Sequence, residues 1–151
     1  MKNIIRLVQT LYTHLKNWEG VALFITRLCI GTIFVQTGFG KLMHFEQTVA
    51  FFSDLGIPFP MINAAMAASV ECIGGALLIV GLMTRVVSVK LAVVMIVAIL
   101  TAQLSEVASL SDLIRLQEVD YLLFFALFLF GGAGKFSLDH WIKTQFFRKT
   151  R

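Results

Sequence analysis

Long apolar runs, separated by short polar segments, dominate the pattern of hydrophobic and polar positions along the chain. A membrane-spanning helix needs about 20 apolar residues to cross about 30 Å of hydrocarbon. Four runs have this character, at residues 20–42, 62–82, 86–104 and 119–132. The last run is short, so we expect its helix to begin earlier, near Ser111. The pattern predicts an all-α integral membrane protein whose four transmembrane helices form an antiparallel bundle.

Three further segments are amphipathic, and we expect each to form a short helix at the membrane surface. In the amino-terminal segment the apolar face consists of Ile4, Val8, Leu11, Leu15 and Trp18. In the first outer loop it consists of Phe45, Val49 and Phe52. That second helix should end at Gly56 and Pro58, because proline disfavours helix in the residue before it. In the carboxy-terminal tail the aromatic residues among basic ones are Trp141, Phe146 and Phe147.

The composition agrees with a membrane protein and excludes several other classes. Hydrophobic residues make up 58% of the chain and charged residues 15%. A typical soluble domain is about 45–50% apolar and about 25% charged. The chain therefore lacks the polar surface of a soluble enzyme, and a disordered chain or a collagen-like fibre is excluded as well.

The basic residues predict how the chain is oriented in the membrane. Lysine and arginine gather in the amino-terminal segment, in the turn after the second run and in the tail, whereas most acidic residues lie in the two other loops. By the positive-inside rule, both termini face the cytoplasm. We expect a cytoplasmic interfacial segment (1–19), a transmembrane domain (20–134) and a basic cytoplasmic tail (135–151). The net charge of +4 then reflects orientation, and nucleic acid is not expected as a partner.

Two charged residues lie deep within the predicted spans, Arg27 in the first and Glu71 in the second. A charge at the bilayer centre costs about 2.5–3.5 kcal/mol even on insertion scales, so such groups usually pair or line a wet cavity. Counted from the cytoplasmic ends of their spans, the two depths differ by about 6 Å. We therefore expect Arg27 to pair with Glu71. The pair would either lock two helices together or take part in proton or quinone chemistry.

Small residues at helical spacing from these two charges predict that the first two spans approach closely. On the first span they are Gly31 and Gly38, and on the second they are Ala67, Gly74 and Gly81.

A second polar group is expected near the outer face, at the ends of three spans. Its members are Lys41, Gln103, Glu118 and Asp120. They would form a polar mouth between the helices, a common position for a ligand site. The alternative is that they are ordinary interfacial residues in contact with headgroup water. Together with Arg27 and Glu71, these four are the candidate cofactor-binding residues.

The chain carries no recognisable motif for a metal or a tightly bound redox cofactor. Cys29 and Cys72 lie at similar depth, but their angular offsets from Arg27 and Glu71 argue against a thiol pair, and no metal site is indicated. No histidine lies within a predicted span to bind haem, no cysteine cluster is present for an iron–sulfur centre, and no nucleotide-binding motif occurs. Any electrons must therefore be carried by a quinone or by a partner subunit.

Three blocks of sequence, in order, resemble the DoxX family of small four-helix membrane proteins. The first, residues 27–42, begins with an arginine and ends with a glycine–lysine pair. The second, residues 71–85, begins with a glutamate before two glycines and ends in Gly-Leu-Met-Thr-Arg. The third, residues 131–139, is a glycine-rich stretch followed by Ser-Leu-Asp. The loop at 51–58 is similar to that of the family too, so the resemblance covers residues 20 to 141.

The resemblance implies a four-helix bundle in the bacterial cytoplasmic membrane. Related proteins include a subunit of a thiosulfate:quinone oxidoreductase and a protein that joins oxidoreductase complexes in redox stress, and others are encoded beside metal-stress systems. It thus implies a membrane subunit of a quinone-linked oxidoreductase or of a redox- or metal-stress system. Only Arg27, Lys41 and Glu71 carry over as motif positions, without an assigned chemistry.

Two alternatives remain at this point, and whether the chain is an enzyme stays open. The chain would be a non-catalytic anchor or assembly partner of a soluble redox or metal-handling protein. Otherwise it would be a carrier of a small solute or metal, which four short helices could support only as an oligomer. The expected partners are the lipid bilayer and either another protein or a second copy of the chain.

Overall fold

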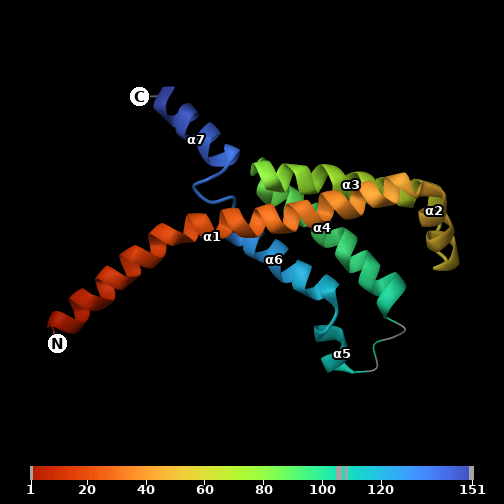
Figure 1. The fold of residues 1–151 in the computed structure, drawn as a ribbon, viewed down its shortest axis with the longest axis horizontal. Helices are drawn as coiled ribbons and strands as arrows, with labels where there is room; N and C mark the ends of the chain where they lie inside the picture. The colour runs from red at the N-terminus through yellow and green to blue at the C-terminus, as the bar shows by residue number, and fades with distance from the viewer. Residues whose placement is uncertain (1, 105–106, 108, 150–151) are drawn as a thin grey trace.

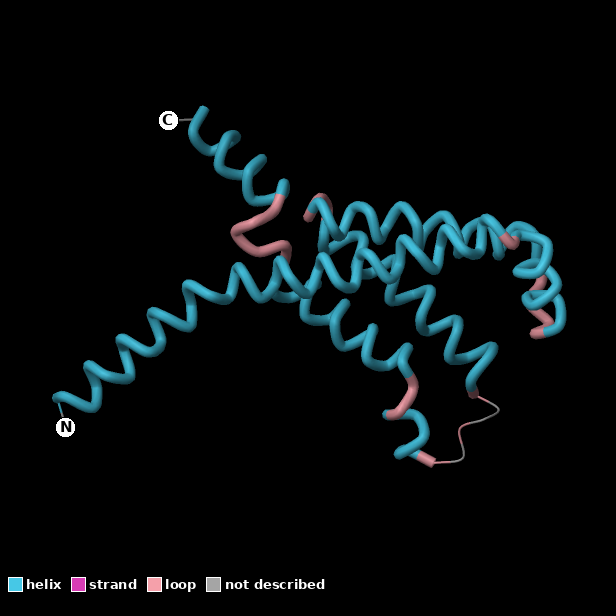
Figure 2. Tube along the Cα trace, in the orientation of Figure 1, coloured by secondary structure: helices cyan, strands magenta, loops and turns pink. Residues whose placement is uncertain are grey.

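The computed structural model describes the backbone of residues 2–104, 107 and 109–149, and the side chains of 18–104, 107 and 109–145. Every regular element in these residues is helical, which confirms the all-α prediction (Figure 2). The elements are α1 (Lys2–Met43), α2 (Phe45–Asp54), α3 (Pro60–Val80), α4 (Thr84–Ala98), the π-helical turn η1 (Ile99–Gln103), α5 (Leu110–Ile114), α6 (Gln117–Gly131) and α7 (Leu138–Lys149).

Three helices are long and apolar enough to cross a membrane, and they confirm the first three predicted spans. They cover Trp18–Met43, Pro60–Val80 and Thr84–Gln103. The fourth run differs from the prediction. Its helix does not begin near Ser111, because the chain leaves the helical conformation at Leu116 (ψ 132°), and α6 has only 15 residues.

A local capping interaction explains the separate short helix before α6. Ser109 and Asp112 form a capping box, in which the Asp112 carboxylate accepts hydrogen bonds from the Ser109 backbone N–H at 3.0 Å and hydroxyl at 2.9 Å. This starts α5 as an independent five-residue helix. The polar residues before the apolar run therefore make their own turn and do not extend the run.

The predicted amino-terminal helix is not a separate element. α1 runs without a break for 42 residues, and its first half projects beyond the other helices (Figure 1). Both prolines of the chain lie outside it, so nothing in its sequence interrupts the backbone hydrogen bonds. The apolar face predicted at residues 4–15 lies outside the described side chains.

The helix predicted in the first outer loop is present as α2. Its predicted apolar stripe of Phe45, Val49 and Phe52 is half-buried against the protein, whereas Glu46 and Asp54 are exposed. Gly56, with φ +69°, follows the helix end, in agreement with its predicted role. In the tail, α7 is helical with Trp141 exposed, and the side chains of Phe146 and Phe147 lie outside the described ones.

α1 and α3 form the closest helix pair of the fold, because glycines face each other across it. A Cβ atom on Gly31 would lie 2.7 Å from the Gly75 carbonyl oxygen, and one on Gly75 would lie 2.6 Å from that of Gly31. Gly38 in turn faces the backbone of Ala68 and Cys72. The predicted close approach is confirmed, with Gly75 at the contact and Gly74 instead facing Leu91 of α4.

α4 and α6 complete the core on the other side of α1. Phe125 and Phe128 of α6 are buried, and the Phe125 ring contacts that of Phe34 on α1 at a centroid distance of 5.2 Å. α3 and α4 pack together next to their connecting turn, where Gly74 meets Leu91. Toward their far ends they diverge, as Figure 1 shows, and α2 lies across the end of the α1–α3 pair.

Candidate functional site: a cavity with a buried ion pair

A large cavity occupies the space where α3 and α4 diverge. Its volume is about 1340 Å³, and its walls come from α1, α2, α3, α4 with η1, and α6. Most of the lining is apolar, with side chains such as Phe34, Phe52, Val70 and Val94. The charged side chains that line it are Lys41, Glu71, Lys90 and Glu118. Ligand sites in proteins have this character, an apolar hollow with a few polar groups.

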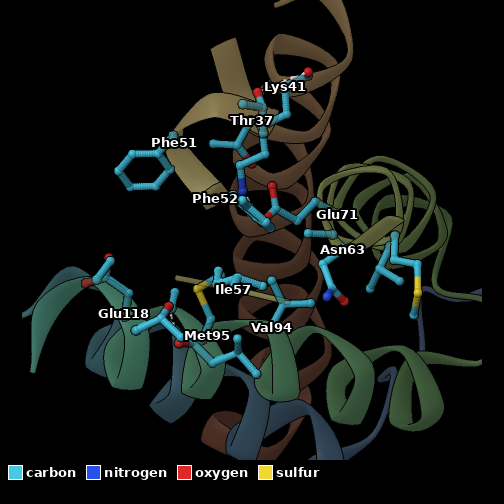
Figure 3. Close-up of a pocket in the computed structure, with 18 of the residues that line it drawn as sticks. Thr37, Lys41, Phe51, Phe52, Ile57, Asn63, Glu71, Val94, Met95 and Glu118 are labelled. Carbon is cyan, nitrogen blue, oxygen red and sulfur yellow. Dashed lines mark hydrogen bonds and ion pairs between the residues drawn. The ribbon is translucent and has the colours of Figure 1, made fainter. Parts of the chain in front are cut away.

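The strongest polar feature of the cavity is an ion pair between α1 and α3. Lys41 Nζ donates to Glu71 Oε1 at 2.5 Å. The Glu71 side chain is only 1% exposed, and that of Lys41 is 33% exposed. Figure 3 shows the two side chains reaching toward each other into the cavity, with Glu118 and Met95 on the opposite wall. Burial of the Glu71 carboxylate strengthens the attraction, because water is excluded from its side of the pair, whereas the Lys41 side is partly exposed.

Only one oxygen of the Glu71 carboxylate is satisfied. Oε2 is buried and finds no hydrogen-bond donor among the described residues. A buried polar atom without a partner costs about 1–3 kcal/mol, and more when it is charged. Since Glu71 lines the cavity, a bound ligand or water that donates a hydrogen bond would remove this cost.

The predicted pairing of Arg27 with Glu71 is wrong, and the helix register explains why. Gly31 faces Gly75 across the α1–α3 contact. Arg27, one turn before Gly31, is therefore level with Ile79, eight residues from Glu71 along α3. At 1.5 Å per residue this is about 12 Å, twice the offset expected from depth alone. Lys41, predicted for the outer group, takes the position as partner of Glu71.

Arg27 instead joins three segments at the opposite end of the bundle. It is fully buried, and its guanidinium donates to the Leu78 carbonyl at 3.3 Å and the Phe136 carbonyl at 2.5 Å. A Cβ atom on Gly81 would overlap with the Arg27 guanidinium, and Gly81 also has φ +74°. Arg27 thus ties α1 to the end of α3 and to the segment before α7.

Asp139 completes this junction and was not recognised as a functional position from the sequence. Its carboxylate accepts hydrogen bonds from two backbone N–H groups at the start of α4. These are the N–H of Met83, just before the helix, at 2.8 Å and the N–H of Thr84, its first residue, at 3.0 Å. Its own N–H donates to the Gly81 carbonyl at 3.0 Å. The Ser-Leu-Asp motif of the third sequence block was the available signal. The junction holds α7 on the α3–α4 turn and caps α4.

The predicted outer polar group is brought together in part. Gln103 donates to Glu118 Oε1 at 3.5 Å, and both line the cavity with Lys41. Gln103 ends η1, and π-helical turns often occur at functional sites. Asp120 is exposed and does not line the cavity. Whether these residues bind a ligand stays a prediction.

Two further polar residues of the cavity carried no distinguishing sequence signal. The Gln117 amide donates to the Tyr121 hydroxyl at 2.5 Å, and both residues line the cavity from α6. The Tyr121 ring contacts Phe34 with a centroid distance of 5.1 Å. Both positions lie within or beside an apolar run, and only the fold turns them toward the cavity.

The thiols and possible metal ligands form no cluster in the part of the chain that the structure describes. Cys29 is exposed, Cys72 is half-buried, and both are free thiols. Among these described residues, no group of three or more histidine, cysteine, aspartate or glutamate side chains is arranged to hold a metal ion.

Comparison with known proteins finds one family and several relatives. The DoxX family model matches residues 22–104. The "Putative oxidoreductase CatD" of Bacillus subtilis is 36% identical over 108 residues, which cover 72% of this chain and 75% of that protein. "Inner membrane protein YphA" of Escherichia coli is 38% identical over 69 residues, covering 46% of this chain and 49% of that protein.

A third relative extends the match but adds no function. It is an uncharacterised membrane protein of Mycobacterium tuberculosis, 30% identical over 125 residues that cover 75% of this chain and 76% of that protein. No solved structure matches.

Proposed function

The chain belongs to the DoxX family, and we propose that it is the membrane subunit of a quinone-linked redox system. In this proposal the cavity between α3 and α4 binds the quinone, and Lys41 and Glu71 contact its headgroup. The name of the CatD relative supports the assignment to redox chemistry, because that protein is named as an oxidoreductase.

The observation that carries the proposal is the half-satisfied Glu71 carboxylate in an apolar cavity. Glu71 lines the cavity, its Oε1 is held by Lys41, and its Oε2 is buried and lacks a donor among the described residues. The reduced form of a quinone carries hydroxyl groups, and one of them bound there would donate to Oε2 and remove the cost of this unpaired atom. The apolar lining suits the rest of such a ligand, whose ring and substituents gain free energy from leaving water.

The two side chains have complementary roles toward the headgroup. Lys41 has three N–H donors, of which one is used by Glu71, so others are free to donate to a quinone carbonyl. Glu71 Oε2 is the acceptor for a hydroxyl group of the reduced headgroup. A quinone supplies the redox step when bound, since it takes up two electrons and two protons. In the proposal the electrons come from a partner subunit.

The proposal includes a location and a topology. We place the protein in the bacterial inner membrane, as the name of the YphA relative suggests. α6 would be a fourth, shorter span of about 22 Å, for which the bilayer thins locally. Both termini would then face the cytoplasm, in keeping with the positions of the basic residues. The first part of α1, α2 and α7 would lie at the membrane surface.

A binding experiment with matched variants tests the proposal. Purified protein is incubated without oxygen with a reduced quinone, separated from free ligand and analysed for the bound ligand by its absorbance. Glu71→Gln removes the carboxylate and should lower the affinity by about tenfold or more, the loss of one charge-assisted hydrogen bond. Glu46→Gln makes the same chemical change on the exposed side of α2 and should leave the affinity unchanged.

Two further measurements, copurification and liposome flux, distinguish the alternative functions. Absence of quinone binding by the folded protein would contradict the proposal. Copurification of a soluble redox protein instead would favour an anchor or assembly partner. Ion or solute flux in liposomes would favour a carrier.

A further inference from the structure

We infer that the ligand of this cavity carries a long apolar tail and enters sideways from the bilayer, through an opening between α3 and α4. This inference rests on the proposed function and narrows its substrate class. A membrane quinone with a chain substituent would fit the opening. A small water-soluble ring compound has no apolar tail and does not need a route from the bilayer.

The opening is defined by side chains that both line the cavity and are exposed on the outside of the protein. On α3 and α4 they are Met66, Val89, Lys90, Val93 and Val97. Met66 is 59% exposed and Val93 is 53% exposed. A residue with both properties stands at the mouth of a cavity and not in its interior.

The mouth lies within the part of the protein that faces lipid. Its residues belong to the spans Pro60–Val80 and Thr84–Gln103, and all except Lys90 are apolar. The long side chain of Lys90 can carry its ammonium group toward the membrane surface. The contact of Gly74 with Leu91 closes the gap between the helices on the side of the α3–α4 turn. Beyond this contact the rim on α4 runs from Val93 to Val97, four residues or about 6 Å along the helix. An opening of this kind between two apolar spans faces the lipid chains and can accept an apolar tail.

The distribution of polar and apolar groups in the cavity indicates that the headgroup lies at the inner wall and the tail at the mouth. Lys41 and Glu71 provide the polar contact on the inner wall, and Glu71 is buried there. Met66, Val93 and Val97 provide only apolar contact at the mouth. The volume of about 1340 Å³ exceeds the range of about 300–1000 Å³ usual for small-molecule sites, so it has room for a headgroup and the first part of a tail.

The test compares two probes with the same quinone ring, one bearing a ten-carbon alkyl tail and one without a tail. The full-length protein is reconstituted in lipid nanodiscs, and binding of each probe is measured. Referred to the free concentration in water, the tailed probe should bind at least about tenfold more tightly, because moving two methylene groups out of water already corresponds to about that factor.

A pair of tryptophan variants tests the position of the opening. Val93→Trp fills the mouth and should slow association of the tailed probe by about tenfold. Ile96→Trp is the control, because Ile96 is 46% exposed on the same helix but does not line the cavity. Should Val93→Trp fail to fold, Met66→Trp blocks the mouth from α3.

Each outcome decides between the two claims. Equal affinity of both probes, referred to their free concentrations in water, or equal slowing by Val93→Trp and Ile96→Trp, overturns the lateral entry of a tailed ligand. In that case, if Glu71→Gln lowers the affinity for both probes, the quinone site is still supported. Failure of both probes to bind the unmodified protein overturns the proposed function, and this inference with it.

Discussion

Arg27 and Glu71 are both charged residues inside apolar helices, but their surroundings give them different roles. Arg27 is buried, and its guanidinium donates to the carbonyls of Leu78 and Phe136, which belong to two other segments. Glu71 has one oxygen on Lys41 and another that lacks a donor among the described residues. Arg27 therefore stabilises the fold. The Lys41–Glu71 pair instead retains an acceptor atom to which a ligand would donate a hydrogen bond.

Replacing Arg27 should affect stability and leave ligand binding intact. Arg27→Gln removes hydrogen bonds from a charged donor to two carbonyls, each worth about 1.5–3 kcal/mol. We expect the free energy of unfolding to fall by about 3–6 kcal/mol, the sum for the two bonds, with a lower thermal midpoint in detergent. Quinone bound per folded molecule should not change.

Arg115→Gln is the control for this substitution, because Arg115 is exposed. An Arg27→Gln protein with an unchanged thermal midpoint but no quinone binding would contradict the structural role of Arg27.

At the scale of the helices, the glycines of α1 decide how closely α3 can pack. Gly38→Ala would push a Cβ atom into the backbone of Ala68 and Cys72. Overpacking of this kind costs about 1–3 kcal/mol, so we expect a lower thermal midpoint. Gly40→Ala is the matched control, since no atom lies within 4 Å of its added Cβ atom.

Alanine at position 40 should be neutral or stabilising, because glycine within a helix costs about 0.5–1 kcal/mol relative to alanine. Equal thermal midpoints for Gly38→Ala and Gly40→Ala would show that the α1–α3 contact is looser than described here.

The link between α7 and the α3–α4 turn depends on Asp139. Asp139→Ala leaves the N–H groups of Met83 and Thr84 without their acceptor. Loss of a helix cap costs about 0.5–2 kcal/mol, and we expect destabilisation of this size. Limited proteolysis should also release the tail faster. Asp54→Ala, on an exposed residue at the end of α2, should change neither property.

The helices themselves were predictable from the sequence, because the length of an apolar run is a local property. The runs at 20–42, 62–82 and 86–104 correspond closely to the observed spans. The break before α6 was missed, although Ser109 and Asp112 have the spacing of a capping box. The unbroken α1 was missed because an amphipathic stretch and an apolar run can share one helix.

The site was less predictable than the helices, because it depends on register and on helix divergence. Arg27, Lys41 and Glu71 were singled out as polar residues of the spans, but the predicted pairing of Arg27 with Glu71 was wrong. Depths counted from the span ends differ by about 6 Å, whereas the contact of Gly31 with Gly75 sets the two residues about 12 Å apart along the helices. The cavity itself follows from the angle between α3 and α4, and no local pattern in the sequence encodes that angle.

For the molecule as a whole, the proposal requires that α6 crosses the membrane. In Figure 1 the first part of α1 and α7 extend from the same end of the bundle. With a fourth span, a phosphatase that works only outside the cytoplasm should be inactive when fused after α7. The same phosphatase should be active when fused after Ser109 in the loop before α5. Activity at both sites would contradict the four-span topology.

The central claim is that Glu71 and Lys41 form a quinone site, and one measurement tests it most directly. The protein is purified in mild detergent from its native membrane, and mass spectrometry identifies the small molecules that remain bound. The account predicts a near-stoichiometric quinone that is retained by Glu46→Gln and lost from folded Glu71→Gln protein. Only bulk lipid in the unmodified protein, or quinone retained equally by Glu71→Gln, would contradict it.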